Sequence, residues 1–392
     1  MSMPVPRILF ISSEFPPGPG GIGNHAYHLV EELRKRGCEL RVITPQEFAT
    51  TAEIASFNRA QPFPVQTIPK RRSSMSKGVF WLRNAIAVDK SFRPDLIIAS
   101  GARAVWVAAV STQKRKTPLL AVGHGSEFGG QLTPERRLTR WAFNQAAAVV
   151  YVSHYTQQVA RNLGIHPRRE LVIHNGADAS LFSQTSPEAK QKWAQSLGFS
   201  PTDPILLTVG NLTRRKGQEV VIRALPGLLT DFSTLRYLMA GLPTEKTMLA
   251  SLAGELGISD HVHFLGNVAR AELPVLYQAC DLFVMTSQRL SDGDFEGFGI
   301  SVIEAALCGK PAVVSGDSGL AEAVIDGVTG ICVPEKDPVQ TAIAIKKLLS
   351  EPETLLRMGK NAQERAQAEL TWEKVGMEYY NLVNSLISNS RI

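Results

Sequence analysis

Phe295-Glu296-Gly297-Phe298-Gly299-Ile300-Ser301-Val302-Ile303-Glu304-Ala305 is the stretch from which the chain is best interpreted. Glu296 lies in a Gly-Phe-Gly turn, and Glu304 follows about two turns into the helix expected to begin near Gly299. Gly297 and Gly299 lack a Cβ, so their backbone can approach a ligand closely. A helix start suits an anion such as a diphosphate, and carboxylates suit the vicinal hydroxyls of a sugar. The stretch therefore indicates a nucleotide-sugar site, with a glycine turn before two solvated glutamates as the alternative.

Short apolar runs alternate with helical segments along the first half of the chain. The runs expected as strands are residues 7–11, 40–44, 95–99, 119–122, 148–152 and 171–173. Continuous apolar runs of this length indicate strands buried on both faces, as in a parallel sheet. The helices between them indicate an α/β fold with helices on both faces of that sheet.

The same alternation restarts after residues 183–203, a polar stretch that we interpret as the domain boundary. The strands expected here are residues 205–209, 236–240, 262–265, 281–285 and 312–314. The tail is expected to be a helix over residues 372–387 that buries Met377, Tyr380, Leu382, Val383 and Leu386. The prediction is therefore an α/β protein of two doubly wound, parallel-sheet halves, which a length of 392 residues accommodates.

Composition excludes several classes of protein. The 20% charged content is too low for a disordered chain, and no apolar run approaches the ~18 residues that would cross a bilayer. The apolar residues 8–11 lack the flanks of a secretory signal. The four cysteines are far apart and have no metal-ligand spacing, which indicates buried thiols in a reducing compartment. A cytoplasmic location is therefore expected.

Charge is distributed unevenly between the two halves. Residues 1–180 contain 23 Lys+Arg and 12 Asp+Glu, a balance of +11, which leaves −5 for the remainder of a chain whose net charge is +6. A basic first half suggests an anionic partner, such as a phosphorylated acceptor or the inner face of a membrane, or simply a solvated surface. The segment 70–83 could lie on a membrane, but a surface helix with Trp81 and Leu82 facing the core is favoured. The sequence contains no nucleic-acid module with base-stacking aromatics, so a nucleic-acid partner is not expected.

Glycines follow the first expected strand with the spacing of a dinucleotide fingerprint. Gly18, Gly20 and Gly23 match G-x-G-x-x-G, and a helix is expected after them. The loop begins several residues after the strand, and the second strand ends at Thr44-Pro45, where a ribose-binding acid would be expected. We therefore discount a dehydrogenase and retain a strand, glycine loop and helix that could hold a phosphate.

Cations follow the first strand of the second half. Arg214, Arg215 and Lys216 lie between that strand and a helix, a position that favours phosphate binding. His124 follows a strand of the first half, where ligands of such sheets bind, although an ordinary loop histidine is the simpler interpretation. Asp292 and Asp294 imitate a metal-binding D-x-D pair, but no further ligand cluster supports it, so no metal site is predicted.

Together these motifs resemble a retaining glycosyltransferase of family 4 with the GT-B fold, similar to bacterial hexosyl- and mannosyltransferases. The resemblance covers nearly the whole chain. It rests on the motifs at residues 14–17, 20–23, 124–127, 175–178, 215–217, 264–266, 296–304 and 326–330.

The resemblance implies a donor site in the second half. Lys216, with Arg215 or Arg214, would neutralise the donor diphosphate, Glu304 would accept from the ribose hydroxyls, and Glu296 would hold the donor sugar. The implied donor-binding set is Gly21, Arg214, Arg215, Lys216, Asn267, Val268, Glu296, Gly297, Phe298, Gly299 and Glu304. Among these, the main chain at Asn267 and Val268 would meet the base, and the amides of Phe298 and Gly299 would meet the sugar or phosphate.

The resemblance also implies an acceptor site in the first half. Residues 1–183, with a returning helix over residues 373–392, would bind the acceptor, and residues 184–372 would bind the donor. The implied acceptor-binding residues are Gly20, Gly21, His124 and Glu127, and the implied catalytic residues are His124, Glu296, Lys216 and Arg215. The nucleotide sugar would be a co-substrate, no other cofactor is implied, and the acceptor would be lipid-linked, phosphorylated or a polysaccharide.

Two positions depart from the family pattern. Asn211 stands where many members have an arginine, and Leu320 stands where many have a glycine. A sugar-nucleotide epimerase and a non-catalytic nucleotide-sugar sensor remain as alternatives, whereas a pyridoxal-dependent phosphorylase would be far larger than this chain. An epimerase would need no acceptor, and a sensor would bind a nucleotide without transferring a sugar.

Overall fold

The computed structural model describes residues 5–18, 20–70, 74–113, 115–129, 133–183 and 188–390. The chain divides into two compact units, one of Met1–Asn175 with Trp372–Ile392 and one of Gly176–Thr371. The second unit therefore begins before residue 183, where the sequence placed the end of the first domain. The reason is local packing, because Phe182 is fully buried with its ring 5.7 Å from that of Tyr277, and its carbonyl accepts from the Cys308 thiol.

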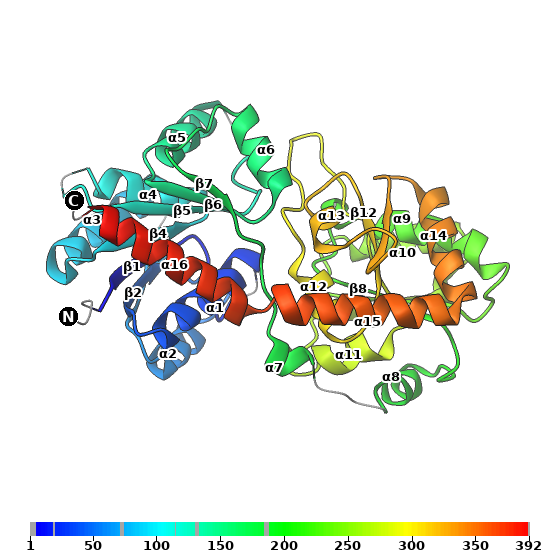
Figure 1. The fold of residues 1–392 in the computed structure, drawn as a ribbon. Helices are drawn as coiled ribbons and strands as arrows, with labels where there is room; N and C mark the ends of the chain where they lie inside the picture. Colours follow the sequence, from blue (N-terminus) through cyan, green and yellow to red (C-terminus); the bar gives the residue numbers. More distant parts are fainter. Residues whose placement is uncertain are drawn as a thin grey trace. The chain divides into compact units, whose positions relative to one another are not determined.

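The first unit is built on a parallel sheet with the strand order β3-β2-β1-β4-β5-β6-β7 in the described residues (Figure 1). Its strands are β1 (Arg7–Ser12), β2 (Glu39–Thr44), β3 (Val65–Thr67), β4 (Leu96–Ser100), β5 (Leu119–Gly123), β6 (Ala148–Tyr151) and β7 (Glu170–Val172). Its helices are α1 (Gly21–Lys35), α2 (Thr51–Ala60), α3 (Ser74–Phe92), α4 (Ala102–Ser111), α5 (Thr133–Asn144), α6 (His154–Asn162) and α16 (Trp372–Ser390). The order reverses direction between β1 and β4, and this is where ligands of doubly wound sheets bind, at the carboxyl ends of the strands.

Helix α16 completes the first unit although it is the last element of the chain. It packs along α1, as the red and blue helices of Figure 1 show. The two backbones approach closely at Gly376, where an added Cβ would lie 2.4 Å from the Cβ of Glu32. At the start of α16, the buried Trp372 stacks on His28 with ring centroids 5.0 Å apart. The returning helix implied by the resemblance is therefore part of the fold.

The second unit repeats the architecture with a parallel sheet of order β10-β9-β8-β11-β12-β13 in the described residues. Its strands are β8 (Ile205–Val209), β9 (Arg236–Ala240), β10 (Val262–Gly266), β11 (Leu282–Met285), β12 (Ala312–Ser315) and β13 (Gly330–Val333). Its α-helices are α7 (Ala179–Phe182), α8 (Ala189–Leu197), α9 (Gln218–Leu229), α10 (Lys246–Glu255), α11 (Leu273–Ala279), α12 (Ile300–Leu307), α13 (Leu320–Ala323), α14 (Pro338–Ser350) and α15 (Pro352–Glu369). Two 3-10 turns, η1 (Arg214–Lys216) and η2 (Ser259–His261), precede α9 and β10.

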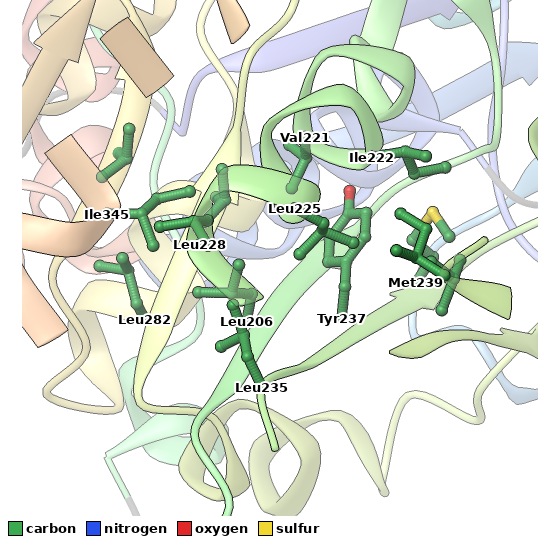
Figure 2. Close-up of a cluster of buried hydrophobic side chains, with 14 of the residues drawn as sticks. Leu206, Val221, Ile222, Leu225, Leu228, Leu235, Tyr237, Met239, Leu282 and Ile345 are labelled. Atoms are coloured by element: carbon green, nitrogen blue, oxygen red, sulfur yellow. The ribbon is translucent and has the colours of Figure 1, made fainter. Parts of the chain in front are cut away.

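The core of the second unit lies between its sheet and the helices α9 and α14. Figure 2 shows Val221, Leu225 and Leu228 of α9 together with Leu206 of β8 and Ile345 of α14. All five side chains are at most 1% exposed. Because the central strands of such a sheet are covered on both faces, their side chains are mostly apolar, which explains the apolar runs of the sequence.

The structure confirms the predicted α/β class and the two parallel sheets. It adds two strands that the sequence did not indicate, β3 and β13, each at the edge of a sheet. Trp81 is 2% exposed, so the favoured core-facing interpretation of residues 70–83 holds for it, while Arg71 and Arg72 lie outside the described residues.

Two expected core residues of the last helix are not buried. Met377 is 48% exposed and Tyr380 is half-buried, whereas Leu382, Val383 and Leu386 are buried as expected. The other buried apolar side chains of α16 are Trp372, Val375, Tyr379 and Ile387. In the described part of the chain, no helix is long and apolar enough to cross a membrane.

Candidate functional site

The turn between β8 and α9 holds the cations that the sequence singled out. Gly217 ends this turn with φ +72°, and an added Cβ would lie 1.8 Å from the carbonyl oxygen of Thr286. The turn is therefore pressed against the chain that follows β11, where only a glycine fits. This contact holds the Arg215 and Lys216 side chains in a largely buried position, with 25% and 13% of their surface exposed.

A single carboxylate, that of Glu296, lies against both cations. Its Oε2 is 2.6 Å from Lys216 Nζ and also accepts a hydrogen bond from Arg215 Nη1. Arg215 Nε lies 3.2 Å from Asp294 Oδ2. The structure thus brings Glu296 against Arg215 and Lys216, which lie about 80 residues earlier in the sequence. Asp294 is a second ion-pair partner of Arg215.

The electrostatics of this cluster shift the pKa values of Glu296 and Arg215 toward their charged forms, whereas burial shifts those of Lys216 and Asp294 toward their neutral forms. Burial alone would raise the pKa of Glu296, but Arg215 and Lys216 outweigh it and bring the pKa to about 2. The neighbouring Glu296 raises the pKa of Arg215. Burial lowers the pKa of Lys216, an effect that the charge of Glu296 partly offsets. Two cations thus lie against the carboxylates of Glu296 and Asp294, and an incoming anion would compete with these carboxylates for the cations.

The glycine turn after Glu296 is shaped by close backbone contacts. Gly299 precedes α12 with φ +87°, and an added Cβ there would lie 2.3 Å from Leu320 Cδ2. An added Cβ at Gly319 would lie 1.9 Å from the carbonyl oxygen of Gly297. Leu320 is fully buried, so the departure from the family pattern at this position fills space beside the start of α12.

Glu304 lies on α12 and is 6% exposed. Its carboxylate accepts a hydrogen bond from the Tyr277 hydroxyl at 2.8 Å. Burial raises the pKa of Glu304 to about 7, although the hydrogen bond from Tyr277 opposes this shift. Glu304 is therefore a carboxyl group that can exchange a proton near neutral pH.

The remaining donor-side residues lie at the surface. Arg214 is 70% exposed and is 3.8 Å from Glu245, so it is not part of the Glu296 cluster. Asn211, the other departure from the family pattern, accepts from the Leu242 amide at 3.3 Å. Asn267 is exposed and Val268 half-buried in the loop after β10.

His124 follows β5 in the first unit, within a group of buried rings. Its Nε2 lies 2.8 Å from the Ser100 hydroxyl, and its ring centroid is 4.8 Å from that of His25. Burial lowers the pKa of His124 to about 3, so the ring is neutral at physiological pH. His25 in turn contacts Trp372 and Tyr379 of α16, which ties the His124 loop to the last helix.

Glu127 holds the loop after β5 in shape. Its Oε2 accepts from the amides of His124 and Gly125 at 2.9 Å and 2.8 Å. The side chain is 2% exposed, and its Oε1 has no hydrogen-bond partner among the described residues. Burial raises the pKa of Glu127 to about 7, with a smaller contribution from Glu14. One oxygen thus holds the loop in shape, and the other is buried without a partner among the described residues.

A cavity of about 290 Å³ lies beside Glu127. Its lining includes Glu14, Glu47 and Glu127, together with Arg103. Gly20 allows Glu14 to enter this region, because an added Cβ at Gly20 would lie 2.2 Å from Glu14 Oε2.

Glu127 was expected from the sequence as an acceptor-binding residue, whereas Glu47 was not. The missed signal is the position of Glu47 three residues after the end of β2, close to where an acid was sought at Thr44-Pro45. At Gly21, which the resemblance assigns to the donor diphosphate, an added Cβ would meet no described atom within 4 Å.

The Asp292-Gly293-Asp294 segment forms a tight local loop, in which the Asp294 amide donates to Asp292 Oδ1 at 3.0 Å. Within residues that the structure describes, no group of three or more His, Cys, Asp or Glu side chains is placed to hold a metal ion.

Two family models match the chain, one for each unit. Residues 19–181 match the model described as Glycosyltransferase Family 4, and residues 189–365 match the model described as Glycosyl transferases group 1.

Curated relatives match over nearly the full length. The chain is 27% identical to a GDP-mannose-dependent monoacylated alpha-(1-6)-phosphatidylinositol monomannoside mannosyltransferase of Corynebacterium glutamicum, over 97% of this chain and 98% of that protein. It is 25% identical to a glycogen synthase of Mycobacterium tuberculosis, over 94% and 92%.

Among solved structures, Anabaena Alr3699/HepE in complex with UDP and glucose superposes with a TM-score of 0.82. The two sequences are 24% identical, and the match covers 97% of this chain and 99% of that one. This likeness supports the GT-B assignment of the fold.

Proposed function

Because the chain belongs to the glycosyltransferases that join a family 4 domain to a group 1 domain, we propose that it moves a hexose from a nucleoside diphosphate sugar to an acceptor hydroxyl with retention of configuration. The proposed donor is GDP-mannose, which the name of the Corynebacterium glutamicum relative specifies for that protein. The observation that carries the proposal is the cluster in which Arg215 and Lys216 meet Glu296.

The proposed chemistry depends on charge and position. The leaving group of such a transfer is a nucleoside diphosphate, so cations facing its oxygens stabilise the charge that develops as the glycosidic bond breaks. We assign this role to Lys216 and Arg215, which would supply the positive charge that a metal ion supplies in other enzymes. Removing one such contact typically costs about 100-fold or more in turnover.

The other donor contacts follow from the same assignment. Glu296 would accept hydrogen bonds from the donor sugar hydroxyls once the diphosphate shares its cations, and Glu304 would accept from the ribose. The amides of Phe298 and Gly299 would face the sugar or phosphate at the start of α12. Asn267 would meet the base with its main chain.

The first unit is the proposed acceptor domain. His124, neutral at physiological pH, would contact the sugars as a hydrogen-bonding group rather than as a cation. Gly20 and Gly21 would allow close approach of the acceptor and the donor diphosphate. The acceptor is proposed to be a sugar or cyclitol, free or lipid-linked.

The test is nucleotide binding followed by turnover. Calorimetry with GDP, UDP and ADP is expected to detect one preferred nucleotide, and the matching nucleotide sugar is expected to release it when an acceptor is supplied. Lys216→Ala and Glu296→Gln should each lower turnover about 100-fold. The matched controls are Lys360→Ala and Glu364→Gln, an exposed pair 3.8 Å apart elsewhere in the same unit.

Three outcomes would contradict the proposal. Absence of binding heat with every nucleoside diphosphate would show that the chain has no donor site. Conversion of the donor sugar without any acceptor would indicate an epimerase, and binding without release would indicate a sensor.

We also propose that the first unit contacts the anionic inner face of a membrane through α5. Arg136, Arg137 and Arg140 are exposed on this helix, beside Leu138 and Trp141, which are 38% and 39% exposed. Exposed apolar groups flanked by arginines suit an anionic bilayer surface. Co-sedimentation with anionic vesicles should be strong at low salt and weak at high salt, and Trp141→Ser should reduce it.

A further inference from the structure

The segment that contains Asp292 and Asp294 is closely ordered by its own hydrogen bonds. The Gly293 amide donates to the Leu290 carbonyl at 2.9 Å, and the Leu290 amide donates to the Asp294 carbonyl at 2.9 Å. Gly293 has φ +93°, a left-handed conformation that favours glycine. Together with the bond from the Asp294 amide to Asp292 Oδ1, these contacts close residues 290–294 into a turn that restrains the position of Asp294.

The same segment is fastened to the turn η1, which carries the donor-site cations. Gln288 donates its main-chain amide to the Arg215 carbonyl at 2.8 Å and its side-chain amide to the Arg214 carbonyl at 2.7 Å. Thr286 donates its hydroxyl to the Gly217 carbonyl at 2.9 Å. The main chain at Arg215 is therefore restrained by the chain that follows β11.

Asp294 contacts the Arg215 side chain at a different nitrogen from Glu296. Asp294 Oδ2 lies 3.2 Å from Nε, whereas Glu296 accepts from Nη1 and also contacts Lys216. A guanidinium is a rigid planar fork, so a carboxylate at Nε fixes the direction in which the two Nη nitrogens point. An anion can therefore displace Glu296 from Nη1 while Asp294 stays at Nε.

We propose that Asp294 is a positioning residue of the donor site, which holds Arg215 at Nε and so presents its Nη nitrogens to the diphosphate of the sugar donor. The inference rests on the proposed function, in which Arg215 neutralises that diphosphate. Arginine binds phosphate oxygens best through two parallel N–H groups, so the orientation of the guanidinium decides how well it binds. An arginine that is not held in advance must be ordered on binding, and this ordering lowers the affinity.

The test is calorimetry of the full chain with GDP, UDP, ADP and inorganic pyrophosphate. Asp294→Ala is expected to weaken the binding of the preferred nucleoside diphosphate and of pyrophosphate by a similar factor, about tenfold, because both lose an oriented guanidinium. Asp294→Asn should lose less, since its side-chain oxygen can still accept from Nε. The matched control is Asp231→Ala, which breaks a 2.6 Å ion pair with Lys346 in the same unit. The Asp231 side chain is 40% exposed, close to the 35% of Asp294.

A double-mutant cycle separates positioning from a merely structural role. In the Arg215→Ala background, Asp294→Ala should cause no further loss of affinity for the nucleoside diphosphate, because Asp294 acts only through Arg215. A further tenfold loss in that background would show that the turn supports the site as a whole, and it would refute the positioning role. Hydrogen exchange in peptides from β8 and β11 checks the folding of each variant, and Asp294→Asn takes the place of Asp294→Ala in the cycle if the alanine variant is unfolded.

The outcomes distinguish this inference from the proposed function. If a nucleoside diphosphate binds wild type, and Asp294→Ala binds it equally or more tightly, the inference is wrong and the donor site stands. If pyrophosphate binds with the stated loss in Asp294→Ala but no nucleoside diphosphate binds, the positioning role is confirmed and the transferase proposal is wrong. If none of the four anions binds wild type, both are wrong.

Discussion

Replacing Glu296 by glutamine removes one negative charge and leaves two cations beside it. Lys216 and Arg215 are both largely buried, and both lie against the carboxylate of Glu296. Glutamine has nearly the same shape, so the substitution changes charge with little change in packing. We therefore expect the second unit to be destabilised by an electrostatic effect whose size can be worked out.

The size follows from the pKa of Glu296. The cations bring this pKa to about 2 from an ordinary value of 4.5, against the opposing effect of burial. At about 1.4 kcal/mol per pKa unit, the difference corresponds to about 3 kcal/mol. Breaking a buried ion pair by removing one partner costs a similar amount, about 3–5 kcal/mol. Because the folded-state pKa is the lower one, this stability is present above pH 4.5 and is lost as the pH falls toward 2.

Hydrogen exchange is the suitable assay, because peptides from β8 and β11 report on the second unit alone. A loss of about 3 kcal/mol should speed exchange of the most protected amides roughly 100-fold at neutral pH. At pH 3 the difference between wild type and Glu296→Gln should shrink to less than half. Glu364→Gln, whose carboxylate is 63% exposed, is the control and should change exchange little.

The same variant separates binding from turnover. Without the competing carboxylate of Glu296, Lys216 is free to meet a diphosphate and Arg215 keeps only Asp294 as an ion-pair partner. Glu296→Gln should therefore bind the nucleoside diphosphate at least as tightly as wild type while turnover falls. A change in amide protection of less than threefold would refute the electrostatic reasoning. Loss of nucleotide binding in a folded variant would show that Glu296 does not compete for these cations.

Three further predictions concern single positions. Gly217→Ala should destabilise the second unit by at least about 2 kcal/mol, since φ is +72° and the Cβ would meet the Thr286 carbonyl. Gly327→Ala, with the same φ but no described atom within 4 Å of its Cβ, should cost less in the same hydrogen-exchange assay. Burial raises the pKa of Glu304 to about 7, so stability should fall by about 3 kcal/mol as the pH rises from 4.5 to 7, and Glu304→Gln should abolish this dependence in urea titrations. Burial holds the pKa of His124 near 3, so its imidazole signals should not titrate by NMR between pH 5 and 9.

The strands were predictable because their environment is uniform. A strand covered on both faces is apolar at most positions, as in β4 and β8, and such a run is visible without any knowledge of its neighbours. The edge strands β3 and β13 are short and only partly buried, and β3 contains the polar Gln66 and Thr67, so their sequences give a weaker signal. Met377 was placed on the buried face because helical spacing defines that face only to within one residue. The close approach of α16 to α1 at Gly376 decides which residues of α16 face the core.

The residues of the donor site could be predicted from the sequence, but the ion pairs between them could not. Residue types and the family resemblance named Arg215, Lys216 and Glu296 as separate donor ligands. Their pairing depends on how the turn before α9 meets the chain after β11, a contact between segments about 70 residues apart. Glu47 was missed for a related reason, because a carboxylate belongs to a cavity only through loops that converge after folding.

The return of α16 to the first unit has a consequence for biosynthesis. Trp372, Tyr379 and Val383 are buried, and their partners on α1 are made more than 300 residues earlier. During translation, at ~5–20 residues per second, α1 therefore waits for tens of seconds with an uncovered apolar face. A ribosome that stops at residue 371 would release a second unit whose own elements are all present and a first unit that lacks one wall of its core. Such truncated chains should be preferred clients of chaperones that bind near the ribosomal exit tunnel.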